Sequence, residues 1–262
     1  MFIGIIYGVV IFLACVLGAI VGLGGGVFIR PIFDAIGYHN VMNISFFSSM
    51  AILTMAVVST AKKMKDGLAI KPGMAALISG GAVVGGFLGN ELLRYLVGGM
   101  ANEHVQLVQI IVTVIVLAVS IFATSKRDLR YELKSKAILP VIGVGLGLIA
   151  AFLGIGGGPI NVPILMIFFG LPIKTATMYS IVIIFFSHAS RLITMGFTTE
   201  GSYGYFDLRF LPFVIIAAAL GGFFGANLSR VFSESVVKKL FICALLAVIA
   251  LNLYNGAVIL WR

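Results

Sequence analysis

The sequence predicts an all-α membrane protein with eight transmembrane helices, arranged as two parallel four-helix repeats. Three observations support this prediction. The mean hydropathy is +1.16, and 61% of the 262 residues are hydrophobic while only 10% are charged, against about 25% charged residues in soluble domains. Apolar runs long enough to cross a bilayer recur along the chain. A glycine-rich segment occurs twice, since Gly24 and Gly156, and likewise Pro31 and Pro163, are 132 residues apart.

The two glycine-rich segments are expected to break the first helix of each repeat. Glycine weakens a helix by about 1 kcal/mol relative to alanine and tolerates positive φ. Breaks at matching positions of two halves are typical of a transporter's substrate site, where helix N-termini attract anions. The alternative is close helix packing through small residues. The candidate substrate-binding glycines are Gly24, Gly25, Gly26, Gly156, Gly157 and Gly158.

The first repeat, residues 1–124, begins with an apolar run over 3–23, and residues 27–36 beyond the glycines add about half a bilayer. Together these are too long for one straight span. Either one helix starts outside the membrane and breaks near its middle, or a full span is followed by a re-entrant half-helix. The other predicted spans are residues 44–61, 73–97 and 105–123.

Residues 125–136 form a hydrophilic linker, and the second repeat, residues 137–262, follows the order of the first. Its expected elements are residues 137–155, 159–170, 174–195, 209–232 and 236–260. Four spans per repeat, an even number, predict that both halves share one orientation. Because basic residues gather in the cytoplasm, we expect a multi-pass protein of the inner (cytoplasmic) membrane, with the linker and both termini cytoplasmic.

Composition and motifs exclude several classes of function. The net charge of +9 would suggest nucleic-acid binding in a soluble chain, but the basic residues here lie between apolar spans, so no nucleic acid is expected. Cys15 and Cys243 lie inside apolar spans and have no metal-binding spacing. The sequence has no HExxH, GxSxG or phosphate-loop motif. We therefore expect no enzymatic activity, no metal and no cofactor.

Arg30 follows the first glycine segment and costs about 2.5 kcal/mol or more at membrane depth unless it finds an acceptor. One interpretation is a guanidinium fork that binds two oxygens of an anion, assisted by the N-terminus of its helix. The other is an ion pair with Asp34, one turn on. Asn161 lies beside Pro163 in the matching segment of the second repeat. The site is thus expected to be pseudosymmetric but charged on one side only.

Polar side chains recur at helical spacing along the predicted span 174–195. The span 44–61 carries its own polar stripe, and the 132-residue offset aligns Ser48 with Ser180. These stripes are predicted to face each other or a cavity, although hydroxyl groups also hold membrane helices together. A histidine here suits proton relay or anion contact, and an arginine either snorkels or contacts the anion. The candidates are Ser48, Ser180, Ser187, His188 and Arg191.

A second pair of motifs completes the repeat. Residues 85–89 read GGFLG and precede Arg94, and residues 221–225 read GGFFG and precede Arg230. Together with the glycine segments, these motifs resemble the TauE/SafE family of sulfite and organosulfonate exporters over nearly the whole chain. The resemblance implies a secondary transporter that exports small sulfur-containing anions; an anion channel, or an importer of another small organic anion, is the alternative. The implied partners are a small anionic substrate, the lipid bilayer and a coupling ion such as a proton.

Overall fold

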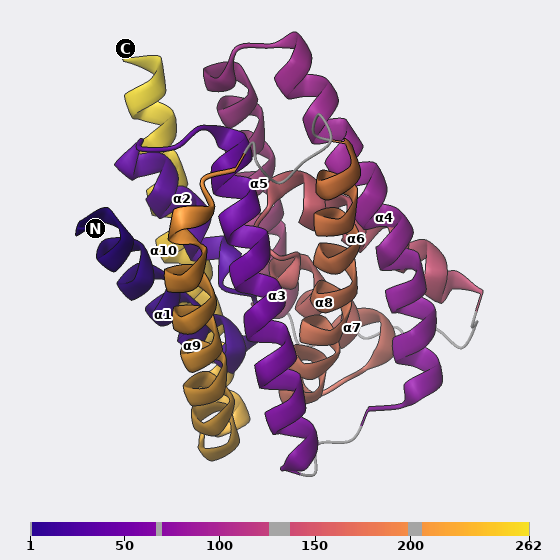
Figure 1. The fold of residues 1–262 in the computed structure, drawn as a ribbon. Coiled ribbons are helices and arrows are strands. Elements are labelled where there is room, and N and C mark those ends of the chain that lie inside the picture. The colour runs from indigo at the N-terminus through magenta and orange to yellow at the C-terminus, as the bar shows by residue number, and fades with distance from the viewer. Residues whose placement is uncertain (1, 67–69, 126–136, 199–205, 262) are drawn as a thin grey trace.

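The computed structural model describes residues 2–66, 70–125, 137–198 and 206–261, which form a bundle of α-helices (Figure 1). The first half contains α1 (Phe2–Val21), α2 (Gly26–Ile36), α3 (Val41–Lys65), α4 (Pro72–Gly99) and α5 (Asn102–Ser125). The second half contains α6 (Ile138–Leu153), α7 (Gly158–Phe169), α8 (Ile173–Thr198), α9 (Leu211–Val231) and α10 (Glu234–Leu260), with the short 3-10 helix η2 (Leu208–Phe210) before α9. The described residues contain no strand.

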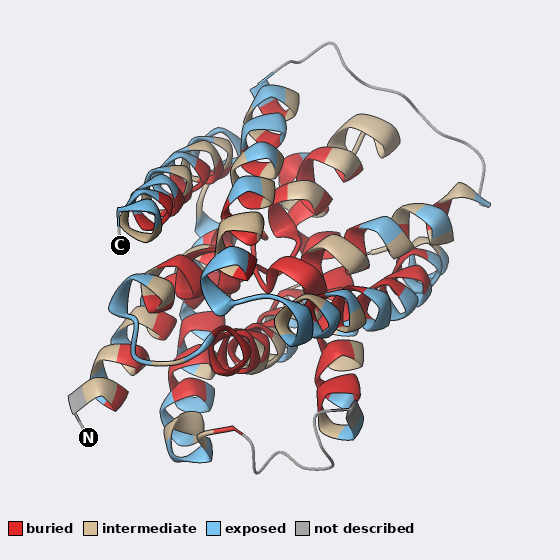
Figure 2. Ribbon diagram, turned by 90° about the horizontal axis from the view of Figure 1, so that it is seen from above, coloured by how far each residue is buried: buried red, intermediate tan, exposed pale blue. Residues whose placement is uncertain are grey.

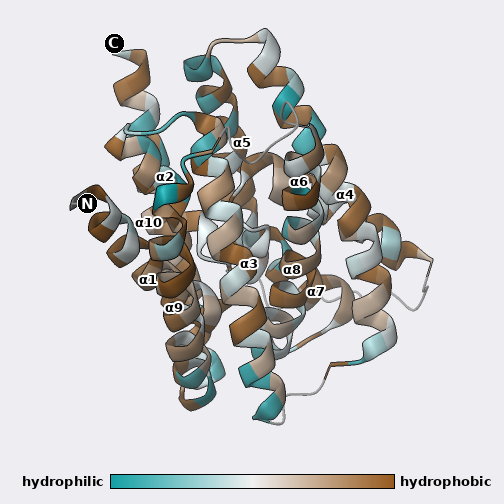
Figure 3. Cartoon of the chain, in the orientation of Figure 1, coloured by the Kyte–Doolittle hydropathy of each residue, from teal (hydrophilic) through white to brown (hydrophobic). Residues whose placement is uncertain are grey.

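The helices have the length and polarity of a multi-pass membrane protein. Seven of the described helices, α1, α3, α4, α5, α8, α9 and α10, are long and apolar enough to cross a membrane, whereas α6 and α7 are shorter. Buried residues face the centre of the bundle (Figure 2), and hydrophilic residues gather toward helix ends and turns (Figure 3). The predicted all-helical membrane fold is confirmed at this level.

Both glycine-rich segments break a helix, as predicted, and the chain then turns back. Tyr7 near the start of α1 stacks on Phe33 near the end of α2, with ring centroids 3.7 Å apart. A Cβ on Gly25 would lie 2.7 Å from the Cys15 sulfur. The helices α1 and α2 are therefore antiparallel and form a re-entrant hairpin whose tip is residues 22–25. The helices α6 and α7 form the second hairpin, with its tip at residues 154–157.

The two repeats have opposite orientations. The Asn43 side chain near the start of α3 accepts a hydrogen bond from the Asp207 backbone beyond the end of α8 (3.1 Å). The Tyr179 hydroxyl near the start of α8 accepts one from the Lys71 backbone beyond the end of α3 (2.6 Å). Hence α3 and α8, which match at the 132-residue offset, are antiparallel. The prediction of two parallel repeats is wrong, because each hairpin returns to its starting side and leaves an odd number of crossings per half.

The helix α4 packs along α6, and α9 packs along α1, in both cases through glycines. A Cβ on Gly85 of α4 would lie 2.1 Å from the Val144 carbonyl of α6, and one on Gly225 of α9 would lie 2.4 Å from the Val16 carbonyl of α1. Both pairs are parallel, so α6 begins where α4 begins and α1 begins where α9 begins. These glycines serve close packing, as expected from their spacing.

This packing places the termini and the linker at opposite ends of the bundle. We call the end that holds the start of α1, the α2–α3 turn and the end of α10 the terminal end. We call the other, with the α3–α4 turn and the start of α6, the linker end. Residues 126–136 lie outside the described residues, but the end of α5 and the start of α6, on either side of them, lie at the linker end. The prediction that the linker and both termini share one side is therefore wrong, because each half has an odd number of crossings.

Candidate functional site

The two hairpin tips meet at the centre of the molecule in a symmetric arrangement. The Ser48 hydroxyl of α3 donates to the Gly154 carbonyl, and the Ser180 hydroxyl of α8 donates to the Gly22 carbonyl, both at 2.7 Å. The donors and the acceptors are each 132 residues apart. Ser48 and Ser180 thus lock each tip to a long helix of the opposite repeat.

The tip glycines leave no room for side chains. A Cβ on Gly158 would lie 2.2 Å from the Leu23 Cα, whereas one on Gly24 would make an ordinary contact, 3.4 Å from the Gly156 Cα, but Gly24 has a φ of 76°, which other residues rarely adopt. A Cβ on Gly26 would meet Ile52 at 2.4 Å. The close approach of the two tips therefore accounts for the glycines by packing, and their contact with a ligand stays a prediction.

Arg30 of α2 is held by four groups in the space between α2, α3, α5 and the second tip. Its guanidinium donates to Ser45 Oγ (3.0 Å), to the Leu153 carbonyl (2.8 Å) and to Gln109 Oε1. The Asp34 carboxylate lies 3.7 Å from Arg30 Nε. Arg30 is only 4% exposed. The ion pair considered from the sequence is present at Nε, while Nη1 and Nη2 donate to the Ser45, Leu153 and Gln109 oxygens.

Arg191 of α8 has far fewer partners. Its Nη1 donates to Ser49 Oγ (3.1 Å), whereas its Nε and Nη2 are buried without a hydrogen-bond partner. His188, one turn earlier, has its Nδ1 3.2 Å from the same hydroxyl, and its Nε2 is also unpaired. Both residues are 0% exposed. Unpaired donors of a buried charged group are costly unless something completes their coordination.

The two arginines converge on the second tip. A Cβ on Gly154 would lie 2.8 Å from Arg30 Nη1 and 3.0 Å from Arg191 Nη1. Two positive guanidinium groups therefore share one buried space, with Asp34 as the carboxylate that pairs with one of them. Like charges repel in a medium of low dielectric constant. The arrangement is suited to an anion whose oxygens accept hydrogen bonds from the unpaired donors of Arg191 and lie close to the positive charge of Arg30.

Two amides of α5 belong to this cluster, and no pattern in the sequence singled them out. Gln109 accepts from Arg30 and donates to the Phe152 carbonyl (2.7 Å). Gln106, one turn earlier, donates to Asp34 Oδ1 (3.1 Å). The available signal was the presence of two glutamines on one face of an apolar helix. Ser45 and Ser49, on the predicted stripe of α3, join the cluster as acceptors.

Two predicted site residues stand apart from the arginines. The Ser187 hydroxyl bonds within its own helix to the Ile184 carbonyl (3.1 Å). Asn161 of α7 lies against Gly157, and both of its side-chain polar atoms are buried without a partner. Among the described residues, no group of three histidine, cysteine, aspartate or glutamate side chains could hold a metal ion.

An aromatic layer closes the cluster toward the terminal end. Phe46 stacks on Phe206 at 4.3 Å, and Tyr7, Phe47 and Phe210 surround His39 within 5.2 to 5.6 Å. His39 Nδ1 lies 2.9 Å from the Tyr7 hydroxyl, and its Nε2 lies 3.9 Å from Asp207. Burial lowers the pKa of His39, and the negative charge of Asp207 acts against this shift. The site is closed to solvent in this conformation.

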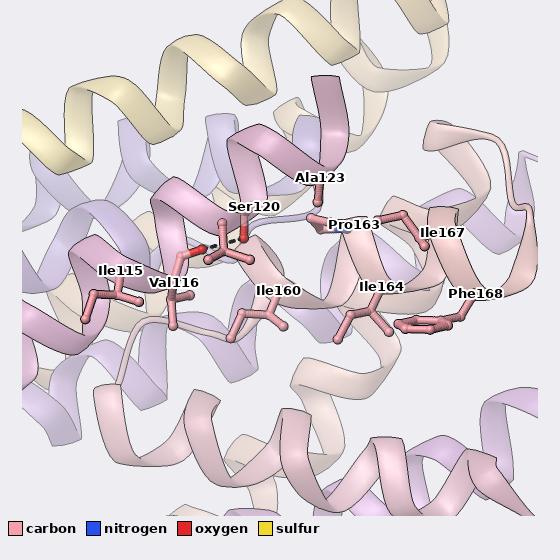
Figure 4. Close-up of a pocket in the computed structure, with 10 residues that line it drawn as sticks. Ile115, Val116, Ser120, Ala123, Ile160, Pro163, Ile164, Ile167 and Phe168 are labelled. Carbon is pink, nitrogen blue, oxygen red and sulfur yellow. Dashed lines mark hydrogen bonds between the residues drawn. The ribbon is translucent and has the colours of Figure 1, made fainter. Parts of the chain in front are cut away.

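Grooves on the outer surface are apolar and do not suit an anion. The groove between α5 and α7 has a volume of about 280 Å³ and is lined by residues such as Ile115, Ile160 and Phe168 (Figure 4). Its hydroxyl, Ser120, bonds to the Val116 carbonyl of its own helix (2.7 Å). Similar grooves lie between α1 and α9 and between α3 and α8. The arginine cluster is therefore the better candidate for the functional site.

Comparison with known proteins agrees with this geometry. The family model of the sulfite exporter TauE/SafE matches residues 7–253. No match was found among curated proteins or solved structures. The match covers both hairpins, all the long helices in at least their greater part, and every residue of the arginine cluster. Because the match covers most of the chain, the chain belongs to the TauE/SafE family, a family of membrane transporters.

Proposed function

We propose that this protein is a secondary transporter that exports small sulfur-containing anions, sulfite or organosulfonates, across the inner membrane. The observation that carries the proposal is the convergence of Arg30 and Arg191 on Gly154, with donors of Arg191 left unpaired. Sulfite and sulfonate groups offer three oxygens, which match the paired donors of a guanidinium fork. The second fork then binds an oxygen that the first does not reach.

The other predicted residues have supporting roles in this proposal. His188 shares Ser49 with Arg191, so its free Nε2 is available to the anion or to a coupling proton. Ser48 and Ser180 hold the two tips in register. The glycines let the tips approach closely enough to form the floor of the site. Asn161 offers an unpaired amide on the second hairpin for the anion as it moves past the tips.

Access to the site requires the hairpins to move. The cluster is buried, and inverted repeats commonly expose a central site alternately through rigid-body motion of one unit against another. Each tip is fixed to the opposite repeat by one serine hydroxyl. A small number of hydrogen bonds would therefore have to break for either side to open.

The distribution of basic residues favours a cytoplasmic linker end, with both termini outside. Eight basic residues lie at the linker end: Lys62, Lys63, Lys65, Lys71, Lys174, Arg230, Lys238 and Lys239. Five more occur in the sequence 126–136, between α5 and α6. Arg94 and Arg209 lie at the terminal end, and Arg262 follows α10. The positive-inside rule then sets the orientation. An inside-negative potential drives an anion outward by about 2.3 kcal/mol per charge per 100 mV.

Anion binding by the purified protein tests the proposal. Sulfite and methanesulfonate are expected to raise the melting temperature of the wild type, because a ligand that binds the folded state stabilises it. Arg191→Ala is expected to abolish this shift. The matched control is Arg94→Ala, since Arg94 is an exposed arginine paired with Glu91 at the terminal end of α4.

Transport by proteoliposomes separates the alternatives. A secondary transporter accumulates sulfite against its gradient when an ion gradient or potential is imposed, whereas a channel only equilibrates it along the electrochemical gradient. An importer would carry the anion in the opposite direction. Failure of the wild type to bind either anion would remove the proposal.

A further inference from the structure

The charges around the site sum to a single positive charge. Arg30 and Arg191 contribute two, and Asp34 offsets one of them. Among the described residues, Lys63 is the other buried amino or guanidinium group, and it lies toward the linker end, where it donates to the Ala19 carbonyl (2.8 Å). The imidazole of His188 shares the Ser49 hydroxyl with Arg191. Because like charges repel, His188 is counted as neutral in this sum.

Two polar groups of the site hold the Asp34 carboxylate in place. Its carboxylate lies 3.7 Å from Arg30 Nε and accepts from the Gln106 amide at 3.1 Å. Its side chain is only 10% exposed. The guanidinium and the amide both stabilise an ionised carboxylate. The negative charge of Asp34 therefore acts on any anion that enters between the two arginines.

We propose that the transported anion carries one negative charge, as a monosulfonate or hydrogen sulfite does, and that Asp34 is the specificity-determining residue that rejects doubly charged anions. This inference rests on the proposed function. One negative charge neutralises the site, whereas a second leaves an excess buried charge that faces Asp34. At a separation on the order of 8 Å and an effective dielectric constant of about 20, the repulsion of one additional charge by Asp34 weakens binding roughly thirtyfold.

Methanesulfonate and sulfate are suitable probes, because both place oxygens around a tetrahedral sulfur but carry one and two charges at neutral pH. We expect the wild type to bind methanesulfonate and to discriminate against sulfate. Asp34→Asn raises the net charge of the site by one. It is expected to improve the binding of sulfate relative to methanesulfonate by about thirtyfold.

A second variant changes the charge in the opposite direction while preserving shape. Gln109 accepts from Arg30, so Gln109→Glu keeps this hydrogen bond and cancels the remaining positive charge, although it loses the bond that the amide donates to the Phe152 carbonyl. The variant is expected to lose the binding of both anions. Asp66→Asn is the matched control for Asp34→Asn, because Asp66 pairs with Lys62 and Arg230 at the linker end. The control is expected to leave the ratio of the two affinities unchanged.

The outcomes separate this inference from the proposed function. Binding of neither sulfite nor methanesulfonate by the wild type removes the proposed function. Binding of methanesulfonate and sulfate with equal affinity, or an affinity ratio that Asp34→Asn leaves unchanged, overturns the inference while the anion site stands. If Asp34→Asn does not fold, the wild-type ratio and the response of Gln109→Glu decide the question, because binding that survives Gln109→Glu also overturns it.

Discussion

Gly154→Ala tests whether the second tip positions the two arginines. Gly154 has φ 66° and ψ 19°, and its Cβ would lie 2.8 Å from Arg30 Nη1 and 3.0 Å from Arg191 Nη1. Gly37 at the end of α2 has the same φ and ψ, but its Cβ would meet only the Asp34 carbonyl at 4.0 Å. Gly37→Ala therefore imposes the same backbone strain without the contact to the arginines.

The two variants are expected to differ in binding more than in stability. An alanine in the left-handed region costs about 1–2 kcal/mol, so both should lower the melting temperature by a similar amount. Optimal separations between such atoms are roughly 3.5–4.0 Å, so the methyl group that Gly154→Ala adds would push both guanidinium ends back by about 0.5–1 Å. Loss of one charge-assisted hydrogen bond, about 1.5–3 kcal/mol, corresponds to roughly tenfold to hundredfold weaker binding.

Thermal unfolding in detergent measures the first quantity, and titration of methanesulfonate measures the second. We expect Gly37→Ala to bind like the wild type and Gly154→Ala to bind at least about tenfold more weakly. Equal binding by the two variants would refute the reasoning, because it would show that the guanidinium groups near Gly154 do not contact the anion.

Three other predictions concern the fork of Arg191, the histidine of the aromatic layer and the orientation of the chain. Arg191→Lys keeps the charge but loses the planar fork, so titration calorimetry should show roughly tenfold weaker methanesulfonate binding; wild-type affinity would contradict a bidentate role. Burial lowers the pKa of His39 below its ordinary 6.5, so as the pH falls the unfolded chain binds the proton first and stability declines. His39→Gln should therefore flatten the fall in melting temperature between about pH 7 and 5, and an unchanged slope would assign it to other groups. In a background that lacks the exposed Cys243, Met100→Cys at the terminal end should react with an impermeant maleimide in intact cells, whereas Ser235→Cys at the linker end should react only after lysis. The reverse pattern would contradict external termini.

Local patterns were sufficient to predict the elements of the fold but not their direction. The apolar runs predicted the long helices, and the glycine segments predicted the breaks, because both depend on interactions within a few turns. The direction of α2 after the break depends on the positive φ of Gly22 and Gly24 and on the stacking of Phe33 against Tyr7. The composition of the segment does not determine these backbone conformations or this tertiary contact. Since parity depends on every crossing, one miscounted hairpin inverted the second repeat.

The residues of the candidate site that could be predicted are those whose burial in a membrane costs the most free energy. Arg30, His188 and Arg191 stood out because charged or ionisable groups at this depth need partners, and the structure brings them together around Ser45, Ser49 and Gly154. Gln109 did not stand out, because a neutral amide costs less to bury and its partner is 79 residues away in the chain. A glutamine in an apolar helix gives no local sign of which distant group it will bind.

The inverted repeats provide a symmetric frame, yet the charges occupy only one half of it. At the matching positions, 132 residues away, the chain has Val162, Phe241, Ala56 and Ser59 in place of Arg30, Gln109, His188 and Arg191. A second copy of the cluster would bury two more guanidinium groups close to the first pair, and unpaired buried charges cost several kcal/mol each. With one cluster the anion has a single binding position, displaced from the tips toward the terminal end. Alternating access then requires the symmetric hairpins to move around a fixed anion, because none of these four matching positions has a charged side chain to which the anion could transfer.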